Sequence, residues 1–217
     1  MKGDVVVIED HHRRVAATIA AGTLAAIGAR PGRFVITVAG ESGSGKSETA
    51  AALAECMADA GLRSVVLGQD DYFVLPPKSN DHRRRNEPDW LGPHVEVHLD
   101  LLQANLDAAL AGATEIEKPA VDYDANAIGT EAVDLEGVKV VIAEGTYVSL
   151  LRHVDARVFI ARSRLETLEH RQKRNRGTEA RDPFIEGVLG IEHKIIAGHR
   201  QLADFIVTRD FDVDRAS

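Results

Sequence analysis

The chain has 217 residues, which is enough for one domain with a full hydrophobic core. Apolar residues make up 44% and charged residues 28%, as in globular proteins, and the net charge of −8 argues against a nucleic-acid binder. The single cysteine, Cys56, excludes an intrachain disulfide, and no apolar run approaches the ~18 residues of a membrane span. Because the N-terminus lacks a signal-peptide pattern, we expect a cytoplasmic protein without membrane or nucleic-acid partners.

The first element expected along the chain is an amphipathic helix over residues 10–29. Its apolar positions recur at roughly helical spacing, at Val15, Ile19, Leu24 and Ile27. Gly28 and the pair Pro31-Gly32 favour the end of this helix. Residues 1–33 therefore form a leading helical segment.

Short apolar runs, typical of buried parallel strands, then alternate with helical patterns. The expected strands cover residues 34–39, 64–68, 138–143, 157–161 and 205–208. The expected helices cover residues 46–60, 95–111, 164–174 and 183–201. Since such alternation implies right-handed crossovers, it predicts a parallel sheet covered on both faces. The predicted fold is a single three-layer α/β domain over residues 1–217, with a central five-stranded parallel sheet.

A glycine-rich loop between the first strand and the next helix matches the pattern G-x-x-x-x-G-K-[ST] in full. It reads Gly40-Glu41-Ser42-Gly43-Ser44-Gly45-Lys46-Ser47. Glycines let backbone N–H groups converge on phosphate oxygens, and the positive end of the following helix attracts the anion. Lys46 is expected to reach the β- and γ-phosphates, and the Ser47 hydroxyl to ligate Mg²⁺. The loop, with Thr49 just beyond it, therefore predicts a site for ATP and Mg²⁺.

Carboxylates follow two more of the predicted strands, at the sheet edge where ligands bind in open α/β folds. Asp70 and Asp71 come after residues 64–68, and Glu144 comes after residues 138–143. A carboxylate at position 70 can accept a proton from an attacking hydroxyl or help to hold the metal. Either aspartate can instead cap the following turn. Glu144 fits the acidic residue that holds Mg²⁺ directly or through water.

Four arginines lie on or just after the predicted helix 164–174, and Gly177 follows them. They are Arg164, Arg171, Arg174 and Arg176. Arg171 and Arg174 are three residues apart and therefore share a helix face. Arginines can stabilise the charge of a phosphoryl group in transfer, and a segment with a glycine hinge can close over ATP. A solvated helix face is the alternative interpretation.

With these features in order, the chain resembles the uridine kinase and phosphoribulokinase family of P-loop kinases from about residue 34 to 208. The strongest parts are the glycine-rich loop and the segments at residues 69–73, 119–124 and 143–145. The resemblance implies a P-loop kinase fold with an arginine-containing lid at residues 171–182. The polar, proline-containing stretch at residues 74–93 is expected to form an acceptor-side insertion.

The resemblance also implies roles for individual residues. Asp70 matches the catalytic aspartate that activates the acceptor hydroxyl, and Glu144 matches the acidic residue near Mg²⁺. Arg171 and Arg176 match lid arginines that contact phosphates, and Arg174 is assigned to the nucleotide. The expected acceptor site is lined by Asp70, Tyr72, Asp89, Trp90, Tyr123 and Arg171.

The segment after Tyr123 departs from the family pattern. Uridine kinases carry a base-reading histidine shortly after the Tyr-Asp pair, whereas this chain continues Ala125-Asn126-Ala127-Ile128. The acceptor is thus a nucleoside or another small metabolite with a hydroxyl. The cluster His82-Arg83-Arg84-Arg85 can alternatively receive a phosphate or carboxylate of an anionic acceptor such as a sugar phosphate.

Three functional hypotheses remain from the sequence. The first is a metabolite kinase that uses Lys46, Asp70, Arg171 and Arg176 for transfer to an alcohol. The second is a non-kinase P-loop NTPase, although the Asn-Lys-x-Asp motif of GTPases is absent. The third is a nucleoside monophosphate kinase, which has less need of Asp70 as a base. A homo-oligomer is compatible with each.

Overall fold

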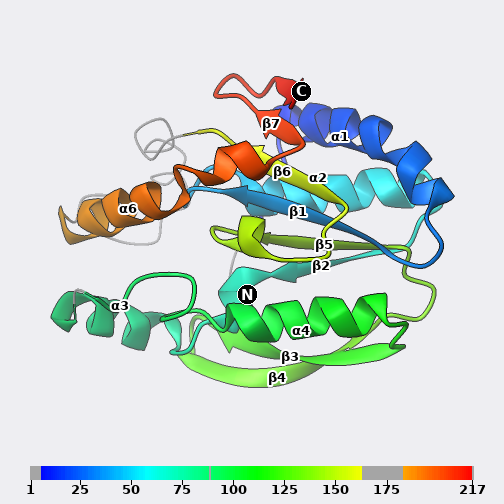
Figure 1. The fold of residues 1–217 in the computed structure, drawn as a ribbon. Coiled ribbons are helices and arrows are strands. Elements are labelled where there is room, and N and C mark those ends of the chain that lie inside the picture. Colours follow the sequence, from blue (N-terminus) through cyan, green and yellow to red (C-terminus); the bar gives the residue numbers. More distant parts are fainter. Residues whose placement is uncertain (1–5, 88, 163–182, 217) are drawn as a thin grey trace.

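The computed structural model describes residues 6–87, 89–162 and 183–216. A six-stranded sheet in the order β2-β5-β1-β6-β7-β8 runs through the centre of these residues (Figure 1). Its strands are β1 (Phe34–Gly40), β2 (Ser64–Gly68), β5 (Val140–Gly145), β6 (Ala156–Ile160), β7 (Phe205–Val207) and β8 (Val213–Arg215). The five predicted strands pair in parallel, and β8 adds an antiparallel sixth strand that the sequence analysis did not predict.

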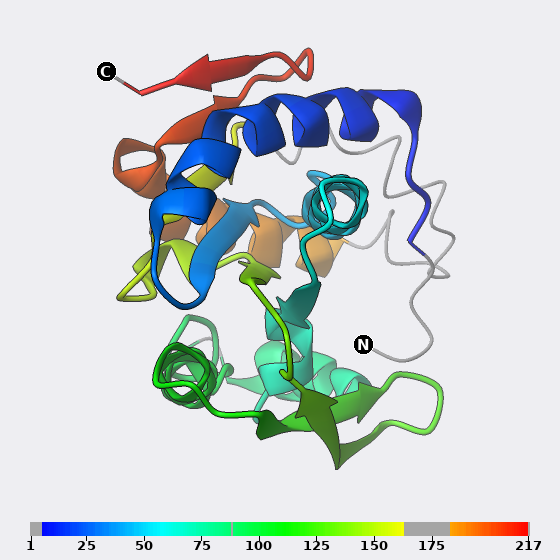
Figure 2. The ribbon, with the colours of Figure 1, turned by 90° about the vertical axis from the view of Figure 1, so that its right-hand side faces the viewer.

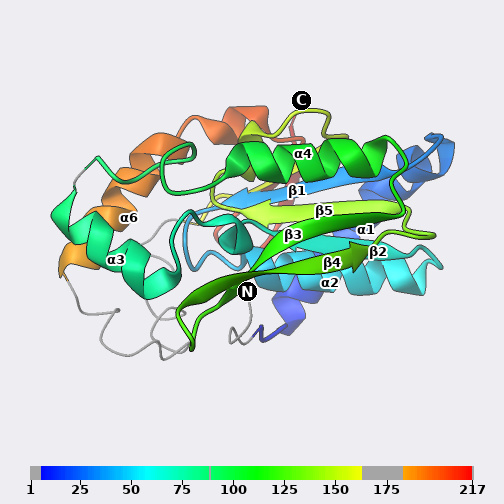
Figure 3. The same cartoon turned by 90° about the horizontal axis from the view of Figure 1, so that it is seen from below.

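Helices cover both faces of this sheet, which confirms the predicted α/β fold (Figure 2). The helices α1 (Asp10–Ala29) and α2 (Lys46–Asp59) cover one face, and α4 (Leu99–Leu110) covers the other. At the edge where the parallel strands end lie α3 (Pro77–Asn86) and α6 (Pro183–Ile196) (Figures 1 and 3). Short 3₁₀ turns are η1 (Gln69–Tyr72), η2 (Val148–Leu150) and η4 (His199–Leu202).

The leading helix α1 has the predicted bounds and is part of the main core. Val15, Ile19 and Ile27 are buried against α2 and the sheet, in one cluster with residues such as Leu53 and Ile142. Leu24, which the helical pattern also placed on the apolar face, is 37% exposed. The buried stripe of α1 thus holds the helix on the domain through burial of apolar surface.

A second, two-stranded sheet, which was not predicted, lies beside α4 and contacts η1 (Figure 3). It is an antiparallel hairpin of β3 (Glu115–Asp122) and β4 (Ala127–Asp134), whose turn contains Asn126 with a φ of 49°. Only part of β3 is buried, whereas most of β4 is exposed. The hairpin turn contacts the start of α3, because Lys78 N donates to Asn126 Oδ1 at 2.8 Å (Figure 3).

Several element boundaries differ from the predicted ones for local reasons. β5 begins at Val140, since Gly137 has a φ of 66° and Val138 N closes a turn onto Leu135 O. The predicted helix 95–111 begins at Leu99, and the predicted helix 183–201 ends at Ile196 before the separate turn η4. Within the described residues, no helix has both the length and the apolarity of a membrane span.

Part of the predicted architecture falls outside the described residues. The expected helix 164–174 and the expected lid 171–182, with Arg171, Arg174 and Arg176, lie there.

Candidate active site

The glycine-rich loop connects β1 to α2 with a backbone that its glycines make possible. Gly43 and Gly45 have φ angles of 78° and 97°, in the region that side chains disfavour. A Cβ at Gly40 would lie 2.8 Å from Ser44 Oγ and 2.9 Å from the Ile160 carbonyl oxygen. The loop therefore needs glycine at these positions to keep its curvature.

Polar groups of this loop fit a ligand rich in hydrogen-bond acceptors. The Ser44 and Thr49 hydroxyls are buried and have no hydrogen-bond partner within the described residues. The free N–H groups at the start of α2 lie beside them, and Lys46 Nζ donates to the Glu41 carbonyl oxygen at 3.0 Å. Buried polar groups normally have partners, so this cradle suits the oxygens of a triphosphate.

The strands β2 and β5 bring the predicted carboxylates beside the loop. Ser47 Oγ donates to Glu144 Oε1 at 3.2 Å, and Asp70 is close enough to Glu144 to influence its ionisation. The ends of the two strands pack tightly, because a Cβ at Gly145 would lie 2.3 Å from Gln69 Cβ. Gln69 Oε1 also accepts from Tyr147 N at 2.7 Å. These contacts fix Asp70 and Glu144 next to each other.

The ionisation of Glu144 is strongly perturbed. Burial, and next the negative charge of Asp70, raise the pKa of Glu144 to about 7, while Lys46 and the Ser47 hydroxyl act in the opposite direction. A hydroxyl and two carboxylates at one point form the oxygen set that Mg²⁺ prefers. The residues thus fit the predicted metal site, because a bound cation would relieve the repulsion between the carboxylates.

Asp71 does not share the site of Asp70. It is buried, its Oδ2 pairs with Lys118 Nζ at 2.7 Å, and its Oδ1 accepts from Val121 N at 3.1 Å. Asp71 therefore holds the β3–β4 hairpin onto η1, and of the two aspartates only Asp70 stands at the loop.

The residues expected at the acceptor site differ in burial and in their contacts. Tyr72 is fully buried, and Asn105 Nδ2 donates to its hydroxyl at 2.9 Å, so its side chain packs in the core of this structure. Trp90 is half-buried and donates from Nε1 to Asn80 Oδ1 at 2.8 Å. Tyr123 is half-buried near the hairpin turn that meets α3, and Asp89 is exposed.

The arginines of the cluster on α3 are each paired with a carboxylate of the protein. Arg83 pairs with Glu87 at 3.0 Å and covers the Trp90 ring, and Arg85 pairs with Asp81 at 2.9 Å. Arg84 points inward and binds Glu96 at 2.6 Å. These pairings weaken the alternative in which the cluster receives an anionic acceptor.

Two contacts from α6 to the glycine-rich loop were missed by the sequence analysis. Glu192 Oε2 accepts from Ser42 Oγ at 3.0 Å, and His193 Nδ1 lies 2.6 Å from Glu41 Oε1. The partners are about 150 positions apart in the chain, so no local pattern indicates the contact.

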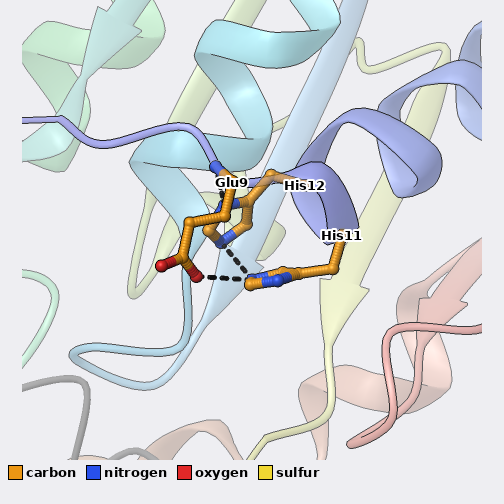
Figure 4. A group of neighbouring side chains, drawn as sticks. All are labelled: Glu9, His11 and His12. Atoms are coloured by element: carbon orange, nitrogen blue, oxygen red, sulfur yellow. Dashed lines mark hydrogen bonds and ion pairs between the residues drawn. The ribbon is translucent and has the colours of Figure 1, made fainter.

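A histidine cluster lies on the other side of the loop, at the start of α1 (Figure 4). His12 is buried near Gly45, and its Nε2 lies 3.1 Å from His11 Nε2. With Glu9, these side chains are grouped closely enough to hold a metal ion. However, His12 Nδ1 accepts from Glu9 N at 3.1 Å, which leaves the ring proton on Nε2. The arrangement thus includes a capping box of α1, in which the Glu9 and His12 side chains each accept from the other residue's backbone N–H.

Comparison with known proteins agrees with this geometry. The family model described as "Phosphoribulokinase / Uridine kinase family" matches residues 35–208. The chain is 32% identical over 192 residues to the bifunctional alpha-galactosidase/sucrose kinase AgaSK of Mediterraneibacter gnavus, and the match covers 83% of this chain but only 20% of that protein. It is 28% identical over 184 residues to a uridine kinase of Latilactobacillus sakei subsp. sakei (strain 23K), covering 80% of this chain and 84% of the relative.

Solved structures with the same fold have lower sequence identity. A possible uridine kinase from Bacillus stearothermophilus superimposes with a TM-score of 0.65 at 18% identity, covering 89% of this chain and 97% of the other. D-glycerate 3-kinase from Cryptococcus neoformans var. grubii gives a TM-score of 0.63 at 16% identity, covering 94% and 99%. At such identities the likeness shows the fold, and the kinases named differ in acceptor.

Proposed function

The chain belongs to the Phosphoribulokinase / Uridine kinase family, and we propose that it transfers the γ-phosphoryl group of ATP to an alcohol hydroxyl of a small molecule. The observation that carries this proposal is the meeting of Ser47, Glu144 and Asp70 beside the glycine-rich loop. A simple NTPase needs the loop and a metal ligand, whereas transfer to an alcohol also needs a base for the hydroxyl proton.

In the proposed reaction, the loop N–H groups and Lys46 hold the phosphates of ATP. Ser47 and Glu144, with Asp70 beside them, would hold Mg²⁺, which when bound neutralises charge on the phosphate oxygens. Asp70 accepts the proton of the acceptor hydroxyl. At the same time the hydroxyl oxygen bonds to the γ-phosphorus, and the bond between the γ-phosphorus and the β–γ bridging oxygen breaks. The resemblance to the family adds Arg171, Arg174 and Arg176 as residues that contact the phosphates.

For the acceptor, a neutral molecule with several hydroxyls, such as a sugar, has the better support. The relative at 32% identity is named as a sucrose kinase, and the arginines of α3 are already paired with carboxylates. A nucleoside is the second candidate, supported by the relative named as a uridine kinase and by Tyr123 at the hairpin turn.

The test is ATP consumption by the purified chain over sugars, nucleosides, glycerate, sugar phosphates and nucleoside monophosphates. We expect turnover that depends on a neutral alcohol and falls in Asp70→Asn. ATP hydrolysis that ignores every acceptor would instead support the NTPase hypothesis. Transfer to a nucleoside monophosphate with Asp70→Asn nearly intact would support the monophosphate kinase hypothesis.

A further inference from the structure

A buried ionic network connects α3 to the segment before α4. Arg84 of α3 binds Glu96 through Nη2 at 2.6 Å and through Nε at 2.7 Å. Glu96 is fully buried, and it also accepts from Asn80 Nδ2 at 3.0 Å. Asn80 in turn accepts from Trp90, a residue expected at the acceptor site. The network therefore begins on the acceptor side of the molecule.

The same network ends on the glycine-rich loop. Arg84 Nη2 lies 3.9 Å from Glu192 Oε1, and the second oxygen of Glu192 accepts from Ser42 Oγ at 3.0 Å. Glu192 lies in α6 and is 5% exposed. The residue after it, His193, contacts Glu41. Two consecutive residues of α6 thus contact two consecutive residues of the loop.

The network buries two carboxylates beside one guanidinium, an arrangement that is not expected to stabilise the fold by itself. The carboxylates of Glu96 and Glu192 share the single guanidinium of Arg84. Burial raises the pKa of Glu192 and the nearby Glu96 raises it further, while Arg84, the Ser42 hydroxyl and Lys46 lower it. Replacing buried ion pairs by apolar residues is often neutral or stabilising, so packing alone does not explain this network.

We propose that Glu192 is a positioning residue for nucleotide binding, which holds Ser42 and thereby sets the curvature of the glycine-rich loop, while Arg84 and Glu96 fix Glu192 from the acceptor side. This inference rests on the proposed function, since it requires that the loop binds ATP. Ser42 lies between Gly40 and Gly43, where the backbone would otherwise have wide conformational freedom. A held loop presents its N–H groups to the phosphates without an ordering cost.

The experiment measures the Kd of ATP with Mg²⁺ by calorimetry on the full chain, in Ser42→Ala, Glu192→Ala and the double variant. Each single variant is expected to bind ATP about tenfold more weakly, as for loss of one hydrogen bond to a charged group. The double variant should be no weaker than either single one, because both remove the same contact. Additive losses, or an unchanged Kd in Glu192→Ala, would overturn the proposal.

The direction in which the Kd of ATP changes distinguishes a positioning role of Glu192 from an effect of its negative charge. Removing a negative charge beside the loop would by itself tighten ATP binding, whereas losing the hold on Ser42 weakens it. Glu192→Gln removes the charge but keeps an acceptor for Ser42, so it should bind ATP at least as tightly as the wild type. Equal weakening in Glu192→Gln and Glu192→Ala would contradict the proposal.

Two further variants serve as controls. Lys194→Ala changes an exposed residue of the same helix and should leave the Kd unchanged. If Glu192→Ala does not fold, the two single variants Ser42→Ala and Glu192→Gln still test the proposal. Wild-type affinity for ATP in Ser42→Ala would overturn it. A wild-type chain that does not bind ATP at all would refute the proposed function itself, which is a distinguishable result.

Discussion

The Ser47 hydroxyl donates to Oε1 of Glu144 across 3.2 Å, which joins the end of the glycine-rich loop to the end of β5. The carboxylate that receives this bond is buried and lies near Asp70, and its pKa is raised to about 7. A group whose pKa is higher in the folded state than the ordinary 4.5 binds more protons when folded. Its contribution to stability is therefore complete below about pH 4.5 and is lost as the pH rises through 7.

The first prediction is that Glu144→Gln stabilises the nucleotide-free chain at pH 8 but not at pH 4.5. At pH 8 the wild-type chain must keep an ionised carboxylate buried near Asp70, and the amide removes that cost of about 3 kcal/mol. Urea unfolding of both proteins at several pH values measures the difference. An equal difference in the free energy of unfolding at pH 4.5 and pH 8 would contradict the assigned cause.

The same variant is expected to lose activity. If Glu144 holds Mg²⁺, the neutral amide should lower kcat by roughly 100-fold, as when a preorganised electrostatic contact is removed. Gain of stability with loss of activity is typical of residues kept for function. Initial rates over a range of Mg²⁺ concentrations provide the measurement, and full activity in Glu144→Gln at low Mg²⁺ would argue against the metal role.

The second prediction contrasts the neighbouring residues Asp70 and Asp71. Asp70→Asn should lower kcat by about 10²–10⁴-fold, the contribution of a general base, while the free energy of unfolding is at least that of the wild type because the repulsion of Glu144 is relieved. Asp71→Asn should have the opposite profile. Among the residues that the structure describes, it leaves the buried ammonium of Lys118 with the half-exposed Glu131 as its one charged partner, at a cost of about 3 kcal/mol.

Steady-state rates and urea unfolding midpoints of the two variants test whether Asp70→Asn loses activity while Asp71→Asn loses stability. Lys118→Met in the Asp71→Asn background gives the control. Because it removes the unpaired charge, it should recover part of the lost stability. A catalytic defect in a stable Asp71→Asn would mean that both aspartates face the acceptor.

Local sequence signals were sufficient to predict the position of the glycine-rich loop in the fold and the two carboxylates near it. The strand Ser64–Gly68 and the helix Asp10–Ala29 have the predicted bounds, because each carries a clear apolar period and a clear stop. The octapeptide from Gly40 lies between a strand and a helix as its pattern requires. The rule that strand ends share one edge was sufficient to bring Asp70 and Glu144 together.

The acceptor half depends on tertiary contacts that no local pattern encodes. β4 is mostly exposed, so the hairpin lacks the apolar run by which the other strands were predicted. Tyr72 follows Asp70 closely in the sequence, yet the 3₁₀ turn η1 directs its side chain into the core toward Asn105. The contact of Ser42 with Glu192 joins residues that only the folded chain brings together.

The third prediction concerns the leading helix, whose role the sequence left open. Ile19 of α1 is fully buried against α2 and the sheet, so Ile19→Ala should lower the free energy of unfolding by about 2–5 kcal/mol. Leu24→Ala in the same helix is the matched control. Because Leu24 is 37% exposed, its truncation should cost under about 1 kcal/mol. Similar small losses in both variants would mean that α1 is only loosely attached.

The fourth prediction tests whether the acceptor is neutral. Arg83 and Arg85 form exposed pairs with Glu87 and Asp81, four residues away on or next to α3. Such pairs contribute only about 0.3–0.5 kcal/mol each, so Arg83→Ala and Arg85→Ala should fold as the wild type does. With a neutral acceptor, kcat/KM should change less than about threefold, since no charge on the acceptor needs these guanidinium groups.

An anionic acceptor predicts a different result for the same variants. A phosphate or carboxylate would have to draw Arg83 away from Glu87, and the loss of a charge-assisted hydrogen bond would lower kcat/KM by at least about tenfold. That loss would shrink as salt screens the attraction, whereas binding of a neutral acceptor does not depend on salt in this way. Measuring kcat/KM of both variants at low and high salt, with the acceptor found in the screen, therefore distinguishes a sugar or nucleoside from a sugar phosphate.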